Sequence, residues 1–454
     1  MKIYQFNSAT VLIESENHGI KTKILCDPWL EGDEYLGSWS IYPPFEFKRE
    51  IFDDLDFIYI SHIHPDHCSS TTLKKLKKNI PVLIHNFPEK FLKEKIERLG
   101  FKVIELEHGI KTPLKENMFI NILAADNCDP SICGNLMGCA LLEFNYKTTQ
   151  IDTMAVFDDG KHVIVNTNDC PFDIGKSTGT IIKEMYPKID LLLVGYVAAS
   201  SWPHCYDMSE YQMEQEAKLK STKKLETTKK YIELFKPKFY LPFAGRYTLC
   251  GKNTILNKFR GEPELEDAFE WLQKNNFEVQ SKGILLNNYS FFDLDLGKNN
   301  EQYYPIDKNE KNEYIQKFLL NKKFSYENEE ICTRNEIIQL SKKAYRNFEK
   351  IREKIKWNSE SSLIIKTKDD EQELYLQISC NGKGINEINE NTLEKIEHYM
   401  QISLDIRLLK WLLLGTHKAY WSNADLGSHL RYRRVGSTYK RGLFYCLNHF
   451  FITN

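Results

Sequence analysis

The sequence lacks a long hydrophobic run, which is the feature that would indicate a membrane protein. A helix needs about eighteen consecutive apolar residues to cross a bilayer. The longest apolar stretch, near Leu408 to Leu414, is interrupted by Lys410. The N-terminal residues also lack the basic start and apolar centre of a secretion signal. We therefore expect a cytoplasmic protein that does not span the membrane.

A strong excess of one charge is lacking as well. The 454 residues include 61 basic and 63 acidic side chains, a net charge of −2, which argues against a nucleic-acid partner. Residues 401–454 are the exception, because they contain eight Lys or Arg and two Asp. This local basic excess indicates a contact with an anionic ligand or with a second copy of the chain.

Closely spaced cysteine pairs are absent too. None of the eleven cysteines forms a Cys-x-x-Cys motif, and the spacing of Cys128, Cys133 and Cys139 matches no zinc or iron–sulfur pattern. An odd number of cysteines without a secretion signal is typical of reduced thiols. We therefore interpret the cysteines as structural residues.

The sequence does contain enough apolar residues for a substantial core, at 42% hydrophobic and 13% aromatic. A chain of this length usually forms two domains. Strands and helices alternate in the first half, which is typical of an α/β protein. We expect strands at residues 10–15, 21–29, 55–62, 81–85, 102–106, 118–126, 139–144, 154–159, 162–169, 189–196 and 239–245, and helices at 71–78, 88–100 and about 210–235.

A boundary between two domains is expected near residue 300. Residues 285–312 are rich in Asn, Lys and Asp and predict a connecting segment. We place a metal-binding catalytic domain at residues 1–290. A smaller α+β domain, for substrate binding or oligomerisation, is expected at residues 310–454, with helices at about 335–356 and 392–414 and strands at 362–367 and 374–379.

A cluster of metal-binding residue types follows the strand predicted at 55–62. His62, His64, Asp66 and His67 lie within six residues, on a loop that precedes a predicted helix. Two imidazoles at i and i+2, followed by a carboxylate and a third imidazole, can bind two neighbouring metal ions from one loop. A polar loop of solvated histidines is the alternative, but donors gathered at a strand end are more typical of a functional site.

This pattern, His-x-His-x-Asp-His, resembles the second motif of the metallo-β-lactamase superfamily. The resemblance implies an αββα sandwich with the metal site at one edge. It further implies that His62 and His64 bind one metal ion and that Asp66 and His67 bind a second. The chemistry expected of such a centre is that two metal ions share a hydroxide nucleophile.

Two further aspartates resemble other motifs of the superfamily, each at the end of a predicted strand. Asp169 matches the fourth motif, and the resemblance implies that it bridges the two metal ions. We therefore predict Asp66 and Asp169 to be catalytic residues as well as ligands. Asp27 matches the first motif. For Asp27, metal binding and orientation of the loop are equally open.

The superfamily's third and fifth motifs usually offer histidines that this sequence lacks. At the third motif the chain has Asp126 and Asp129 instead, and oxygen donors favour iron or manganese over zinc. His204 is a nearby imidazole that could complete the second metal site, although a single loop histidine is more often a hydrogen-bonding residue. We expect one or two divalent metal ions, with iron favoured over zinc or manganese.

Longer segments resemble the catalytic part of the CMP-N-acetylneuraminate hydroxylase family. They include CDPWLEG, DFIYISHIHPDH, DGKHVIVNTNDC and the C-terminal WSNADLGSHLRYRR. Members of that family also carry a Rieske iron–sulfur domain, which needs Cys-x-His and Cys-x-x-His. None of the twelve histidines here has a cysteine two places before it. We therefore expect hydroxylation to need an external electron donor.

Three arginines are candidate substrate-binding residues: Arg246 after the fifth motif, and Arg433 and Arg434 in the basic tail. A guanidinium group beside an aromatic ring suits a nucleotide phosphate and base, whereas the alternative is a solvated or oligomeric surface. The sequence predicts a metal-dependent oxygenase acting on a sugar nucleotide or acidic sugar. A metal-hydroxide hydrolase and a metal-binding protein without turnover are the alternatives.

Overall fold

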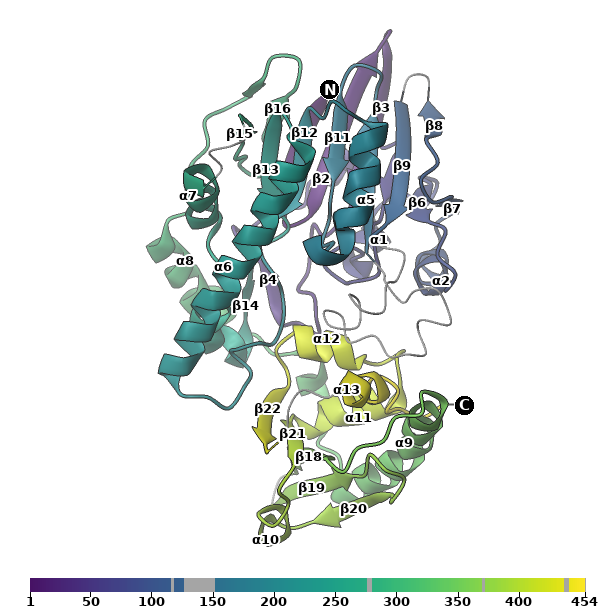
Figure 1. The fold of residues 1–454 in the computed structure, drawn as a ribbon, viewed down its shortest axis with the longest axis vertical. Coiled ribbons are helices and arrows are strands. Elements are labelled where there is room, and N and C mark those ends of the chain that lie inside the picture. Colours follow the sequence, from purple (N-terminus) through teal and green to yellow (C-terminus); the bar gives the residue numbers. More distant parts are fainter. Residues whose placement is uncertain (116–117, 126–151, 276–279, 370–371, 437–440, 454) are drawn as a thin grey trace.

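A computed structural model of the chain describes residues 1–115, 118–125, 152–275, 280–369, 372–436 and 441–453. Two β-sheets stack face to face in the N-terminal part (Figure 1). The first sheet has the strand order β17-β16-β1-β2-β3-β5-β6-β7. Its strands are β1 (Lys2–Asn7), β2 (Thr10–Asn17), β3 (Ile20–Cys26), β5 (Phe57–Tyr59), β6 (Val82–His85), β7 (Val103–Leu106), β16 (Phe291–Asp293) and β17 (Lys298–Asn299).

The second sheet has the order β15-β13-β12-β11-β10-β9-β8. Its strands are β8 (Thr112–Lys115), β9 (Met118–Ala124), β10 (Thr153–Asp158), β11 (Val163–Asn166), β12 (Leu191–Gly195), β13 (Phe239–Phe243) and β15 (Lys282–Gly283). Strands β11, β12 and β13 run parallel, so their carboxyl ends meet at one edge of the sheet. In the first sheet, β3, β5, β6 and β7 are parallel in the same way.

Side-chain alternation explains why both faces of each sheet are buried. In β12, Leu191 and Leu193 face the core between the sheets, whereas Leu192 and Val194 face the outer helices. Strand β3 does the same with Ile24 and Cys26 inward and Leu25 outward. These continuous apolar strands therefore form a four-layer αββα sandwich, and the fold class predicted from the sequence is confirmed.

Helices cover the outer faces of both sheets. The first sheet is covered by α1 (Ser70–Lys75) and α2 (Phe91–Arg98), and the second by α5 (Phe172–Met185), α6 (Glu210–Phe235) and α7 (Leu265–Asn275). Helix α6 begins where its sequence predicts, because Ser209 caps the helix and accepts a hydrogen bond from the Gln212 backbone N–H.

A smaller α+β unit lies at the C-terminal end of the chain (Figure 1). Its sheet has the order β20-β19-β18-β21-β22. The strands are β18 (Ser362–Lys368), β19 (Glu373–Ile378), β20 (Ile385–Ile388), β21 (Tyr399–Ser403) and β22 (Arg431–Val435). The helices are α9 (Arg334–Lys354), α10 (Glu390–Leu393), α11 (Ile406–Leu414), α12 (Trp421–Leu426) and α13 (Arg441–Leu447).

Two predictions about this region are wrong. Residues 291–299 do not form a plain connection, because β16 pairs with β1 and extends the first sheet beyond residue 290. The helix expected at 392–414 is divided by β21, which pairs in parallel with β18. A new helix, α11, then begins after Asp405, whose carboxylate accepts a hydrogen bond from the Arg407 backbone N–H.

The two units share one hydrophobic core. A two-stranded sheet of β4 (Trp39–Ile41) and β14 (Tyr247–Leu249) projects from the sandwich and packs on residues of the C-terminal unit. Trp39 stacks on Tyr247 with 3.6 Å between ring centroids, and its indole N–H donates to the Leu426 carbonyl. The remaining helical segments are η1 (Arg49–Phe52), η2 (Gly251–Phe259), α8 (Lys308–Tyr314), η3 (Ile315–Leu319) and η4 (Ser325–Asn328).

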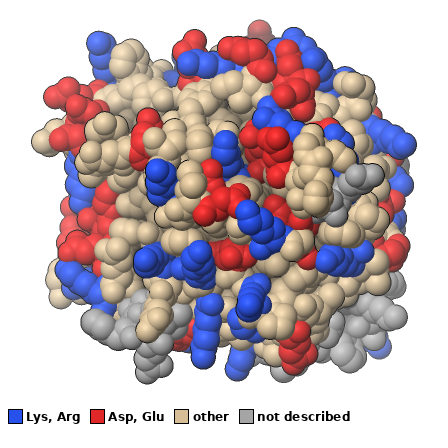
Figure 2. All heavy atoms as spheres, turned by 90° about the horizontal axis from the view of Figure 1, so that it is seen from above, with Lys and Arg blue, Asp and Glu red and all other residues tan. Residues whose placement is uncertain are grey.

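The surface carries both charges in an interleaved pattern. Figure 2 shows Lys and Arg mixed with Asp and Glu over one end of the molecule, as a net charge of −2 leads one to expect. None of the eight cysteines in the described ranges forms a disulfide, and all eight are buried. Among the helices that the structure describes, none combines the length and the apolar character needed to cross a membrane.

Candidate metal centre

The candidate site lies where strands from both sheets end at one edge of the sandwich. Because β3 and β5 are parallel neighbours, Asp27 and the loop that begins at Ser61 follow their adjacent carboxyl ends. Asp169 follows β11 of the opposite sheet. The Asn168 side chain joins the two sheets there, because its amide donates to the Tyr59 hydroxyl at 3.1 Å and to the Thr153 carbonyl at 2.9 Å.

Two groups of possible ligand atoms share Asp169. His62, His64 and Asp169 form one group, and Asp66, His67 and Asp169 form the other. Within each group, the donor atoms all lie within 4.8 Å of one another. The structure therefore brings together five of the six predicted ligands that lie in the described residues, and His204 is the one that it leaves out.

The first group has two ring nitrogens directed at each other. His62 Nε2 and His64 Nδ1 are 2.9 Å apart, whereas two donors on one metal ion at about 2.1 Å lie about 3.0–3.4 Å apart. This spacing fits a shared ion after a small adjustment. A hydrogen bond between the two rings is the arrangement without metal.

The second group contains a buried nitrogen that has no hydrogen bond. His67 Nδ1 lies 2.9 Å from Asp27 Oδ2, which fixes the ring and leaves Nε2 facing Asp169 at 3.2 Å and Asp66 at 3.5 Å. Nε2 has no hydrogen-bond partner among the described residues. A carboxylate that holds one ring nitrogen while the other binds metal is the usual arrangement of a ligating histidine. The site thus fits a metal ion at His67 Nε2.

Asp27 orients this loop, which was one of the two roles left open by its sequence. Its carboxylate also accepts hydrogen bonds from the Ser61 backbone N–H at 2.7 Å and from the Ser61 hydroxyl at 2.8 Å. With these bonds and the one to His67, Asp27 is fully buried and lies outside both groups of candidate ligand atoms. Its φ of +45° places it in the left-handed region, which Asp tolerates better than most residues.

The electrostatics of the site favour a bound cation. Burial, with the neighbouring His67 and His64, holds the pKa of His62 well below its ordinary value, and burial lowers the pKa of His64. Burial would raise the pKa of Asp169, but the three imidazoles outweigh it and lower that pKa. Neutral imidazoles beside an ionised carboxylate are the form in which these groups bind metal.

His67 differs from the other two histidines. Burial alone would lower its pKa, but Asp169, Asp66 and Asp27 outweigh burial and raise the pKa well above the ordinary value. Burial raises the pKa of Asp66 itself. Three carboxylates around one imidazole stabilise positive charge at Nε2, whether a proton or a metal ion supplies it.

Sequence reasoning missed two residues that support the ligands. The Tyr35 hydroxyl donates to Asp66 Oδ1 at 2.6 Å, and the Ser61 hydroxyl lies 2.9 Å from His62 Nδ1. Ser61 directly precedes the histidine motif, so its position was a usable signal. Tyr35 has no local signal, because its contact depends on how the loop after β3 folds.

The other predicted ligands lie elsewhere. Asp126 and its alternative Asp129 fall outside the described residues. His204 is not in either donor group, and the expectation that it completes the second metal site is not supported. Its Nε2 lies 2.7 Å from the Ser428 hydroxyl, and the charged groups that act on it, Lys220, Arg260 and Arg431, would repel a cation.

The three predicted substrate-binding arginines have different surroundings. Arg246 is buried and donates to the Leu286 carbonyl at 2.7 Å, so it supports the fold and is a poor candidate for substrate binding. Arg433 is half-exposed and pairs with Asp207 at 3.6 Å. Arg434 donates to the Tyr206 hydroxyl at 3.1 Å and lies over the Tyr206 ring.

Comparison with known proteins agrees with this geometry. Residues 2–127 match the family described as "Beta-lactamase superfamily domain". The matched residues include the histidine loop and six strands of the first sheet, β1, β2, β3, β5, β6 and β7.

Curated relatives resemble the chain beyond this domain. A protein of Mycolicibacterium smegmatis, whose name places it among the Rieske 2Fe-2S iron–sulfur proteins, is 24% identical over 63% of this chain and 52% of its own length. The cytidine monophosphate-N-acetylneuraminic acid hydroxylase of Macaca mulatta is 26% identical over 50% of this chain and 35% of its own length. The chain thus spans about half, or less, of the relatives that it matches.

A solved structure with partial likeness is CmlA, a diiron β-hydroxylase from Streptomyces venezuelae. It is 16% identical, with a TM-score of 0.38, over 63% of this chain and 53% of its own.

Proposed function

We propose that this protein is a two-metal oxygenase that hydroxylates a sugar nucleotide or a related acidic sugar. The observation that carries the proposal is the shared position of Asp169 between two donor groups. A carboxylate between two sets of imidazole and carboxylate donors is suited to hold two metal ions a few ångströms apart.

Each described residue has a separate role in this proposal. His62 and His64 would hold one ion, Asp66 and His67 would hold the other, and Asp169, which belongs to both groups, would contribute to each. Asp27 fixes the His67 ring through Nδ1, and the Tyr35 hydroxyl fixes one oxygen of Asp66, which directs the other oxygen toward the centre. The ions, when bound, supply Lewis-acid and redox chemistry.

Iron is the metal that we propose, because hydroxylation requires a redox-active ion and mixed imidazole and carboxylate donors suit iron. The overall reaction inserts one oxygen atom of O₂ into a C–H bond and reduces the other to water. It consumes two electrons and two protons. An iron–sulfur protein is the class of donor that we propose, and the name of the mycobacterial relative, a Rieske protein, supports this class.

The substrate class has its support in the second relative, which is named for hydroxylating cytidine monophosphate-N-acetylneuraminic acid. A basic C-terminal segment, with eight Lys or Arg against two Asp, is suited to an anionic substrate of this kind.

The test is turnover of CMP- and UDP-sugars by iron-loaded protein with a ferredoxin and its reductase. We expect a product that is heavier by one oxygen atom, formed only with O₂ and reductant. A product formed without either would instead establish the hydrolase alternative. Bound metal with no product under both conditions would favour a binding protein.

A matched pair of variants ties turnover to the centre. Asp169→Asn keeps the size of the side chain but removes the bridging charge, and should abolish turnover. Asp173→Asn changes an exposed residue four positions later and should leave turnover unchanged. Equal activity in the two variants would contradict the proposed role of Asp169.

A further inference from the structure

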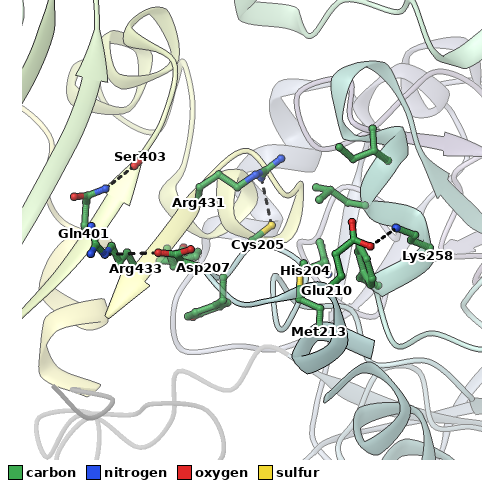
Figure 3. Close-up of a pocket in the computed structure, with 15 residues that line it drawn as sticks. His204, Cys205, Asp207, Glu210, Met213, Lys258, Gln401, Ser403, Arg431 and Arg433 are labelled. Carbon is green, nitrogen blue, oxygen red and sulfur yellow. Dashed lines mark hydrogen bonds and ion pairs between the residues drawn. The ribbon is translucent and has the colours of Figure 1, made fainter. Parts of the chain in front are cut away.

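A cavity of about 540 Å³ lies between the sandwich and the C-terminal unit (Figure 3). One wall consists of the segment after residue 203, the start of α6 and part of η2. The other wall consists of β21 and β22. None of the five residues of the candidate metal centre lines it.

Four polar side chains from β21 and β22 face this cavity together. Arg433 lies directly opposite Gln401 in the antiparallel pair, and Arg431 lies opposite Ser403. Residues two apart in a strand, and residues opposite one another, share a face of the sheet. All four line the cavity, whereas the alternating Met400 and Ile402 belong to the hydrophobic core.

The two walls are fixed to each other by backbone hydrogen bonds. The Tyr432 backbone N–H donates to the Cys205 carbonyl at 2.8 Å, and the Asp207 N–H donates to the Tyr432 carbonyl at 2.8 Å. Residues 205–207 therefore continue the edge of the C-terminal sheet. The cavity is preformed, which reduces the entropy that a ligand must overcome to bind.

The charges of the lining leave one guanidinium without an acidic partner. Lys258 pairs with Glu210 at 3.2 Å, and Arg433 pairs with Asp207 at 3.6 Å. Arg431 instead donates to neutral acceptors, the Ser428 carbonyl and Asn253 Oδ1, both at 2.7 Å. Figure 3 shows Arg431 extending from the C-terminal unit into the cavity, whereas Arg433 lies beside Gln401 and contacts Asp207.

His204 is a buried histidine in the wall of the cavity. It lines the cavity and is only 4% exposed, yet its Nδ1 has no hydrogen-bond partner in the described part of the chain. Its Nε2 contacts the Ser428 hydroxyl at 2.7 Å. Because Nδ1 is itself buried from solvent, His204 supports the wall of the cavity, and the arginines are the groups that a ligand can reach.

From these features we infer that the cavity binds the oxyanion, phosphate or carboxylate, of a small organic molecule through Arg431 and Arg433. A guanidinium fork matches either oxyanion. Met213, Leu256 and Phe259 supply apolar surface for the rest of the molecule. The volume lies within the usual range of small-molecule sites, about 300–1,000 Å³.

The test is calorimetric titration of metal-free full-length protein with three probes. Cytidine monophosphate carries a phosphate, N-acetylneuraminic acid carries a carboxylate, and cytidine carries no charge. We expect one of the two anions, or both, to bind and cytidine not to bind. The choice of probes rests on the proposed function. Binding is measured without metal and without turnover, so a failure to bind would contradict this inference, whereas a failure of the oxygenase proposal would appear only in the turnover assay.

Variants locate the binding to this cavity. Arg433→Gln and Arg431→Gln should each weaken binding of the anion by about tenfold or more, because each loses a charge-assisted hydrogen bond. Arg434→Gln is the control on the same strand, since Arg434 lies opposite Met400 on the other face, and should change affinity by about twofold at most.

Arg433 is the decisive position because it is half-exposed and its substitution does not threaten folding, whereas Arg431 bonds to several groups. Equal affinities of Arg433→Gln and Arg434→Gln would overturn the inference. It would also be overturned if neither anion bound at millimolar concentration, or if cytidine bound as tightly as its monophosphate.

Discussion

At the scale of single residues, the candidate centre depends on side chains that hold other side chains. Asp27 accepts from Ser61 twice and contacts His67 Nδ1, so one buried carboxylate sets both the start of the loop and the direction of a ligand. The Tyr35 hydroxyl does the same for Asp66. Metal affinity is therefore expected to respond to residues that bind no metal.

Asp27→Asn tests this dependence. The amide keeps the shape of the side chain and tolerates the left-handed backbone, but it removes the charge beside His67 Nδ1. We expect metal affinity to fall by about 10- to 100-fold while the protein remains folded. Competition with a chromophoric chelator measures the affinity. Asp53→Asn, at an exposed aspartate, is the control, and the same affinity in both variants would assign Asp27 a purely structural role.

A second prediction at this scale concerns pH. His429 is buried, its Nε2 donates to the Tyr35 carbonyl at 2.8 Å, and burial lowers its pKa to about 4. The unfolded chain, with a histidine pKa of about 6.5, binds more protons between these values. The free energy of unfolding should therefore decrease as the pH falls from about 6.5 to 4, by up to about 3 kcal/mol from this residue.

Urea denaturation at a series of pH values measures this effect. His429→Gln should show a shallower pH dependence over the same window, whereas His417→Gln, at an exposed histidine, should match the unmodified protein. A slope unchanged by His429→Gln would exclude His429 as its source.

At the scale of helices and strands, close packing explains why a glycine lies at the contact between α5 and α6. Gly175 in α5 lies against α6 and β10, and a Cβ built there would overlap the Tyr231 hydroxyl and lie 2.6 Å from Met154 Cε. Alanine favours a helix over glycine by about 1 kcal/mol. Even so, the buried Tyr231 and Met154 side chains, or α5 itself, must move to make room for the methyl group.

We expect Gly175→Ala to lower the free energy of unfolding by about 1–3 kcal/mol, because overpacking outweighs helix propensity. Chemical denaturation followed by circular dichroism measures it. Lys176→Ala, at the next and exposed position, should be neutral or slightly stabilising. A stabilised Gly175→Ala variant would show that the two helices separate at little cost.

The elements of the sandwich could largely be predicted from sequence, because apolar runs and helix caps are local signals. The helix predicted at about 210–235 matches α6 (Glu210–Phe235), and the structure shows that Ser209 caps it. Strand β21 was missed, because Tyr399–Ser403 becomes a strand through pairing with β18, more than thirty residues earlier. Strand β16 was missed for the same reason, since its partner is β1.

The candidate site could be predicted only where its residues are adjacent in sequence or follow a strand. The residues of the loop His62–His67 are adjacent in sequence and follow β5, and Asp169 follows β11. Arg246 was predicted to bind substrate, but it donates to the Leu286 carbonyl instead. That carbonyl lies 40 residues away, so no local signal reveals the contact. His204 was predicted to complete the second metal site, but it lines the cavity between the two units. Its partner Ser428 is 224 residues away, so the sequence near His204 does not predict this contact.

At the scale of the whole molecule, the shared core makes the two units depend on each other. Trp39 is 2% exposed and contacts Tyr35 and Tyr247 of its own unit and the Leu426 carbonyl of the other. Tyr35 in turn holds Asp66 of the candidate centre. Loss of this contact should therefore weaken both units and the metal site.

We expect Trp39→Ala to lower the free energy of unfolding by about 3–5 kcal/mol. Hydrogen exchange should increase together in β12 of the sandwich and in β18 of the C-terminal unit. Tyr211→Ala, at a 70% exposed aromatic residue, is the control. Faster exchange confined to one of the two strands would mean that the units unfold independently.

The central claim is that the loop His62–His67 and Asp169 together hold two metal ions. Elemental analysis of protein purified without chelator and loaded with iron tests it most directly. The account predicts about two equivalents per chain, with both lost in Asp169→Asn and largely lost in His62→Ala, while both variants remain folded. Full metal content in Asp169→Asn, or no bound metal in the unmodified protein, would contradict it.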